Sequence, residues 1–208
     1  MRIDDFDNTL VCDKEDLQTV LSYFKDYRIL PNYIEIAILK IILCQLNINF
    51  QGLKTIDDYF KYIPDDYIDF IIKDINTMFC KQLKAEYSKH HLAYLIYYLP
   101  ANVFKIWKPL LDLQLKNILK PHLRILDVGT GPGSVPIGII EYYRSLAESF
   151  PKISFSLSFS LIDAEEEFLK IANEMITMAK DININNLEII IENLICENID
   201  EHSKFYNL

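Results

Sequence analysis

Apolar residues follow two different spacings along the chain, and the change falls near residue 121. Before it, apolar positions recur at steps of three and four, as at Ile68, Ile71 and Ile75, which is the spacing of one side of an α-helix. After it, short apolar runs and alternating positions appear, which are typical of β-strands. The pattern predicts an all-helical domain over residues 1–120 and an α/β domain over residues 121–208.

The first part contains the start signals of several helices. Asp13 and Thr55 can cap helix starts with their side-chain oxygens. Glycine occurs there only at Gly52, which favours continuous helix over turn-rich β structure. The expected helices run from Asp13 toward Arg28, from Pro31, from Thr55, from Pro64, from about Lys89 to Tyr98, and from Pro100 to about Leu119.

The second part alternates strands with helices. Leu123–Val128 is a short apolar run, and Ile153–Ile162 alternates serine with phenylalanine and leucine. A third strand is expected at Leu187–Ile191, with helices over Ser134–Ser149 and about Ala164–Lys180. This order predicts a parallel sheet with crossover helices, the first three strands of a Rossmann-like fold.

A glycine-rich loop joins the first of these strands to the first helix. It reads Asp127-Val-Gly129-Thr130-Gly131-Pro-Gly133-Ser134. Glycines permit the sharp turn and leave room for a ligand, while the helix that follows presents unpaired N–H groups. Asp163 ends the second strand, beside this loop in a parallel sheet, where a carboxylate can accept both hydroxyls of a ribose. The two features predict a nucleotide-like ligand.

The glycine spacing narrows the choice of ligand. Position 134 is serine where the dinucleotide fingerprint needs glycine, and no phosphate-binding Gly-Lys-Ser/Thr run is present. The acidic residue, the glycines and the acid on the next strand together resemble the class I S-adenosylmethionine-dependent methyltransferases. The resemblance implies S-adenosylmethionine as cofactor, with Asn193 near the adenine amino group. The implied cofactor-binding residues are Asp127, Gly129, Thr130, Gly131, Gly133, Asp163 and Asn193.

A more specific resemblance covers about residues 85–195. The stretch Ala93-Tyr94-Leu95, then Pro100-Ala101, then a helix and the glycine loop, is similar to the small-ribosomal-subunit methyltransferase-like family of bacteria, archaea and mitochondria. Members often carry arginine where this chain has Leu99. The resemblance implies ribosomal RNA or an assembling small ribosomal subunit as the partner.

Charge is unevenly distributed, and this bears on such a partner. Residues 121–208 carry a net charge of −8, whereas residues 81–120 carry +5, in a chain of net charge −9. The acidic part should repel nucleic acid, and the basic segment could face it. Alternatively, the lysines are the solvated face of a helix pair, a common arrangement in soluble proteins.

The sheet is predicted to be incomplete, because this methyltransferase class usually has seven strands. Residues 204–208 look like the entry to a fourth strand. We expect the chain to be a truncated piece of a longer enzyme. Alternatively, it is a short protein that completes its sheet by self-association through an open edge. No catalytic residue can be assigned.

Other signals are absent from the sequence. The start lacks a targeting signal, and the most apolar run, Tyr33–Phe50, is too short and mixed to span a membrane. A cytoplasmic protein is therefore expected. The cysteines are too scattered for a metal site and are expected to be buried free thiols. They are Cys12, Cys44, Cys80 and Cys196.

Three functions fit these patterns. The first is the amino-terminal portion of an RNA- or ribosome-directed methyltransferase. The second is a non-catalytic module that docks on a ribosomal particle through its lysine-rich segment. The third is a small-molecule methyltransferase with a helical dimerisation domain in front of the sheet.

Overall fold

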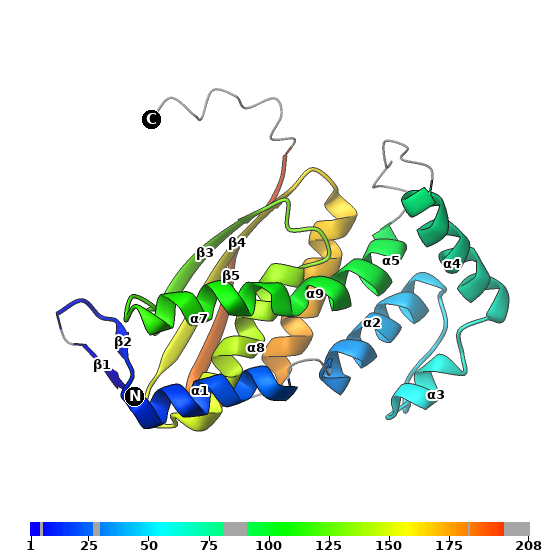
Figure 1. Ribbon diagram of the computed structural model, residues 1–208. Coiled ribbons are helices and arrows are strands. Elements are labelled where there is room, and N and C mark those ends of the chain that lie inside the picture. Colours follow the sequence, from blue (N-terminus) through cyan, green and yellow to red (C-terminus); the bar gives the residue numbers. More distant parts are fainter. Residues whose placement is uncertain (5, 27–29, 81–90, 183, 198–208) are drawn as a thin grey trace.

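A parallel three-stranded sheet and a layer of helices on one of its faces form the centre of the structure (Figure 1). The computed structural model describes residues 1–4, 6–26, 30–80, 91–182 and 184–197. The expected entry to a fourth strand, at residues 204–208, lies outside them. Within the described residues the architecture is mixed α/β and compatible with a partial Rossmann-like fold.

The strands confirm the predicted order and direction. They are β3 (His122–Val128), β4 (Phe155–Asp163) and β5 (Leu187–Cys196), paired in parallel in the order β3-β4-β5. Helix α8 (Ser134–Ser149) joins β3 to β4, and α9 (Glu166–Asp181) joins β4 to β5. The alternation in β4 buries phenylalanine and leucine and leaves the serines between them partly exposed. This difference marks one covered and one open face.

Strand β5 extends beyond its predicted end at Ile191. The register between β4 and β5 shifts after Phe159, so that Ser160 pairs with Asn193 rather than with Glu192. Such a bulge inserts one extra residue while the pairing continues. The strand therefore reaches Cys196, opposite Asp163.

The first part of the chain is not all-helical, which corrects the expectation. A short antiparallel hairpin pairs β1 (Arg2–Ile3) with β2 (Leu10–Val11). Asn8 turns the chain with a φ of 51°, a left-handed conformation that asparagine tolerates. Two-residue strands are too short to give a pattern that sequence reasoning can detect.

The helices that follow begin close to the predicted positions. They are α1 (Lys14–Asp26), α2 (Asn32–Gln45), α3 (Ile56–Phe60) and α4 (Asp65–Cys80). The Asp13 carboxylate accepts the amides of Glu15 and Asp16. Thr55 and Asp58 form a reciprocal capping box on α3. Both predicted caps are confirmed.

The segment before the sheet changes its helix type several times. It comprises α5 (His91–Ala93), the π-helical η2 (Tyr94–Tyr98), α6 (Leu99–Asn102), the 3₁₀ turn η3 (Val103–Ile106) and α7 (Trp107–Leu115). Pro100 has no N–H to continue an α-helical ladder, and the preceding Leu99 amide bonds to Tyr94, five residues back. Helix α7 ends four residues before the predicted Leu119, because Asn117 adopts a left-handed φ of 55°.

One buried cluster contains residues from both parts of the chain. It includes Leu10 and Ile34 from the first part and Tyr142 and Phe159 from the second. Trp107 also joins the parts, since its indole N–H donates to the Gly138 carbonyl of α8 at 2.9 Å. The predicted domain boundary at residue 121 stays a prediction, but the hydrophobic core continues across it.

Two further sequence expectations concern membranes and cysteines. No helix among the described residues is long and apolar enough to cross a membrane. The thiols are less buried than expected, because Cys44 and Cys196 are exposed and Cys12 is half-buried. The side chain of Cys80 lies outside the described set.

Candidate functional site

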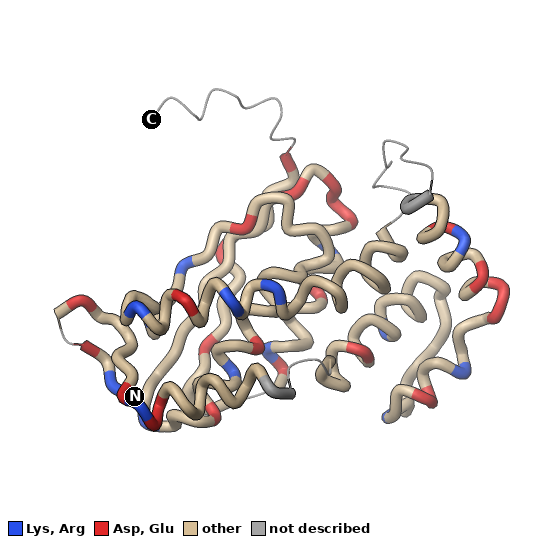
Figure 2. The backbone as a smooth tube through the Cα atoms, viewed as in Figure 1, with Lys and Arg blue, Asp and Glu red and all other residues tan. Residues whose placement is uncertain are grey.

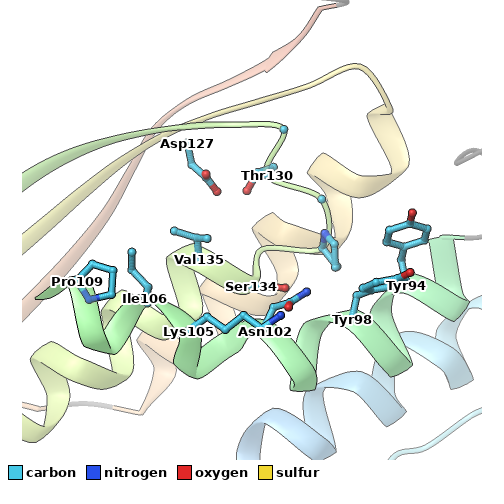
Figure 3. A pocket seen from close by; sticks show the side chains of 13 residues that line it. Tyr94, Tyr98, Asn102, Lys105, Ile106, Pro109, Asp127, Thr130, Ser134 and Val135 are labelled. Carbon is cyan, nitrogen blue, oxygen red and sulfur yellow. The ribbon is translucent and has the colours of Figure 1, made fainter.

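The glycine loop and the segment before the sheet enclose a cavity of about 440 Å³. Figure 3 shows the loop side chains on one side and those of η2 to α7 on the other. The cavity lies at the carboxyl end of β3, where parallel sheets bind ligands. Its lining residues are Tyr94, Tyr98, Asn102, Lys105, Ile106, Pro109, Asp127, Gly129, Thr130, Gly131, Pro132, Ser134 and Val135.

The glycines of the loop have two different structural roles. Gly129 and Gly131 have φ values of 73° and 53°, and a Cβ on either would meet no atom within 4 Å. They therefore supply the turn and leave open space above the backbone. Gly133 instead packs against α9, since an added Cβ would lie 3.2 Å from the Ala172 Cβ.

Asp163 holds the loop in place. One carboxylate oxygen accepts the Gly131 amide at 2.8 Å, and the other accepts the Glu165 amide at 3.0 Å. The side chain is buried, with 7% of the residue exposed. The structure thus brings Asp163 beside the loop as the sequence predicts. The carboxylate already accepts two backbone donors, so a ribose would share or displace the Gly131 contact.

Two polar atoms beside the cavity have no hydrogen-bond partner among the described residues apart from each other. They are one oxygen of Asp127 and the Thr130 hydroxyl, and Figure 3 shows the two side chains pointing toward each other. Burial raises the pKa of Asp127, its interaction with the Thr130 hydroxyl lowers it, and the neighbouring Asp163 charge raises it. Unpartnered buried polar atoms cost free energy, which a ligand that donates hydrogen bonds can recover.

The wall opposite the loop was not predicted as part of the site. Tyr94 and Tyr98 stack on each other at 4.5 Å between ring centroids, and Asn102 and Lys105 follow them along the cavity. None of these four residues was expected at the site from the sequence. Pro100 interrupts the helix directly after the π-helical turn η2. Because π-helical turns are frequent at functional sites, Pro100 was the sequence signal that could have indicated this wall.

Gly138 allows this wall to pack closely against helix α8. A Cβ on Gly138 would lie 2.0 Å from the Val103 carbonyl oxygen and 2.6 Å from the Ile106 side chain. Only glycine allows η3 to approach α8 so closely. The contact sets the position of Ile106 and Lys105 relative to the loop.

Asn193 lies away from the cavity. It is three residues before the end of β5, and its amide donates to the Ser160 hydroxyl at 3.1 Å on the open face of the sheet. The residue opposite Asp163 on β5 is Cys196, and the Glu197 amide donates to the Asp163 carbonyl. The role of Asn193 near adenine stays a prediction that its position does not support.

The fold and site define an α/β protein with a cavity of about 440 Å³ at the carboxyl end of β3. No family model, no curated protein and no solved structure matches this chain. No group of three or more His, Cys, Asp or Glu side chains suited to a metal ion occurs among the described residues.

Proposed function

We propose that this chain binds S-adenosylmethionine and contains the cofactor-binding part of a methyltransferase. The observation that carries the proposal is the cavity beside the glycine loop, where buried polar atoms of Asp127 and Thr130 have no hydrogen-bond partner among the described residues apart from each other. Asp163 lies on the other side of the loop. Together they resemble the cofactor site of class I methyltransferases.

The residues present fit this cofactor. The open space above Gly129 and Gly131 admits a ligand close to the backbone. Asp127 and Thr130 can accept hydrogen bonds from its ammonium group. Asp163 lies behind the loop and is not among the residues that line the cavity, so it would accept the ribose hydroxyls only by exchanging its contact with the Gly131 amide. When bound, the cofactor supplies a methyl group on a sulfonium. The protein's part is to hold that group in position for an acceptor.

Calorimetric titration with S-adenosylmethionine and with S-adenosylhomocysteine tests the proposal. Saturable binding is expected, and Asp163→Ala should weaken it about tenfold or more, because it removes the ribose acceptor and the Gly131 contact. Glu197→Ala is the matched control, since the Glu197 backbone amide donates to the Asp163 backbone carbonyl and the substitution retains that amide. No binding to a folded sample would refute the proposal.

We further propose RNA of the small ribosomal subunit as the acceptor. Lys105 in η3, Lys108 in α7 and Lys116 just after α7 are spaced so as to share one side, and all are exposed. Figure 2 shows basic residues along this stretch of backbone with one acidic residue, Asp112, between them. Lysines spaced along a helix can contact successive phosphates. One end of this surface, at Lys105, also lines the cavity.

Filter binding of a small-subunit RNA fragment at increasing salt tests the acceptor. Affinity should fall steeply with salt, and the double reversal Lys108→Glu/Lys116→Glu should weaken binding and flatten that slope. The double reversal Lys61→Glu/Lys73→Glu is the control, because it makes the same charge change at exposed positions outside η3 and α7. Salt-independent binding would contradict the proposal. RNA binding without cofactor binding would instead favour a docking module.

A further inference from the structure

The face of the sheet opposite the helices is open along all three strands. The described helices lie on the other face (Figure 1). Three large apolar side chains of the open face are strongly exposed: Leu126 is 65% exposed, Val128 50% and Ile190 41%. They alternate along β3 and β5 with residues that the helices cover. Because parallel sheets are normally buried on both faces, this face has the composition of a surface that a partner covers.

The open face changes in character along the strands. At the amino-terminal end it is polar, and the His122 ring of β3 lies 2.9 Å from the Ser156 hydroxyl of β4. At the carboxyl end it is apolar, where Leu126 and Val128 of β3 lie beside β4 and its partly exposed Ile162. The face therefore has a polar end and an apolar end.

An ion pair crosses the middle of the open face. The Arg124 guanidinium of β3 lies 3.1 Å from the Glu192 carboxylate of β5, although β4 separates the two strands. The pair thus lies over Ser158 of β4, whose hydroxyl, together with Arg124, holds the pKa of Glu192 below its ordinary value. The Arg124 side chain is still 83% exposed, so its outer N–H groups can donate to a second carboxylate.

These features make the open face complementary to itself in one orientation. A two-fold interface uses the same surface on both copies. With the axis parallel to β4, β3 of each copy lies over β5 of the other, so Arg124 meets a second Glu192 and the apolar ends meet. With the axis across the strands, β3 would lie over β3, and each apolar end would face a polar one. The pattern of charge and apolar residues favours the first arrangement.

We propose that the open face of β3, β4 and β5 is an interface between two copies of this chain, packed face to face about a two-fold axis parallel to β4. This dimer uses the face of the sheet and leaves the strand edges unpaired. The paired part of the sheet measures about 14 Å by 23 Å. That area is near the lower limit for a specific interface, so the dimer should dissociate reversibly at micromolar concentrations. The inference does not depend on the proposed function.

Sedimentation equilibrium of the full chain, over about 1–300 μM, tests the dimer. A concentration-dependent monomer–dimer equilibrium is expected. Leu126→Asp should weaken dimerisation about tenfold or more, because it places a charge in the apolar end of the interface. Leu21→Asp is the matched control, since Leu21 is exposed at 45% but lies on α1, and it should leave the equilibrium unchanged. A monomer at every concentration would overturn the inference, because something other than a second copy would then cover the face.

A pair of charge reversals tests the orientation. Arg124→Glu should abolish dimerisation because each Glu192 would face a like charge, and Glu192→Arg should do the same with positive charges. An equimolar mixture of these two variants should dimerise again, because both contacts between the copies then join opposite charges. Circular dichroism checks that each variant is folded. A mixture that remains monomeric, or single variants that dimerise as well as wild type, would overturn the proposed arrangement.

Discussion

Asp127 has a charge that the folded protein without ligand does not compensate. Its pKa is raised from the ordinary 3.8, chiefly by burial. A carboxyl group with a raised folded-state pKa favours folding at low pH, and that contribution is lost as pH rises from the unfolded value through the folded one. At neutral pH the ionised side chain is therefore a cost that binding of a cation can offset.

Asp127→Asn should raise the thermal midpoint at pH 7 and weaken S-adenosylhomocysteine binding about tenfold. The gain in stability should shrink as pH falls toward 4, because the wild-type carboxyl is then protonated as well. Thermal melts at several pH values, with calorimetric titration, measure both effects. Asp112→Asn, at an exposed position on α7, should change neither. A lower midpoint for Asp127→Asn at pH 7 would contradict the argument.

Side chains of the site differ in how far the sequence could reveal them. Asp127 and Asp163 were predictable because each ends a strand beside the glycine loop, where backbone topology determines position. Lys105 and Asn102 were not, since they reach the cavity only through the packing of η3 on α8. From the sequence, Asn193 was expected just after the third strand, whereas β5 contains a bulge and continues to Cys196.

The approach of η3 to α8 depends on one position, Gly138. Gly138→Ala should destabilise the protein by about 2–3 kcal/mol, because the added methyl overlaps the Val103 carbonyl and the Ile106 side chain. It should also weaken ligand binding by moving the wall that contains Lys105. Urea unfolding and calorimetry measure the two changes. Glu148→Ala, at an exposed position of α8, should stay within about 0.5 kcal/mol of wild type. An unchanged stability would show that η3 moves aside freely.

Elements with a strong local signal were predicted well, and those that tertiary contacts determine were not. Helix α8 has the predicted bounds, because apolar spacing and the preceding glycines both define it. The β1–β2 hairpin is tied to Leu119 by the Leu10 amide, a contact between residues far apart in sequence. Such a contact leaves no periodic pattern in the residues that make it.

A buried ion pair within α8 contacts the first part of the chain through Tyr33. Arg144 on α8 donates to Glu141 at 2.8 Å and to the carbonyls of Ala179 and Ile182 near the end of α9. Tyr33 on α2 donates to the same Glu141 carboxylate, and its ring lies under the Arg144 guanidinium. The group thus connects α2, α8 and α9 through one cluster.

Arg144→Met should destabilise the protein by about 3–5 kcal/mol, because it leaves the Glu141 charge buried without its cation. The double variant Arg144→Met/Glu141→Leu should recover part of that loss by removing the stranded charge. Lys170→Met, which breaks an exposed pair with Glu166 on α9, should cost less than about 1 kcal/mol. Urea unfolding compares all three. A double variant less stable than Arg144→Met would show that the buried Glu141 charge is not the cause of the destabilisation.

The continuous core also predicts how the protein unfolds. Trp107, the single tryptophan, lies before the sheet but packs on Tyr142 and Gly138 of α8. Its fluorescence should therefore change at the same urea concentration as the far-ultraviolet circular dichroism of all helices and strands, as in a two-state transition. Arg144→Met should shift both midpoints together. If the circular dichroism instead shows a second transition that Trp107 does not report, residues 1–120 contain a part that folds independently of the sheet. That outcome would support the two-domain prediction and limit the shared core to the contacts around α8.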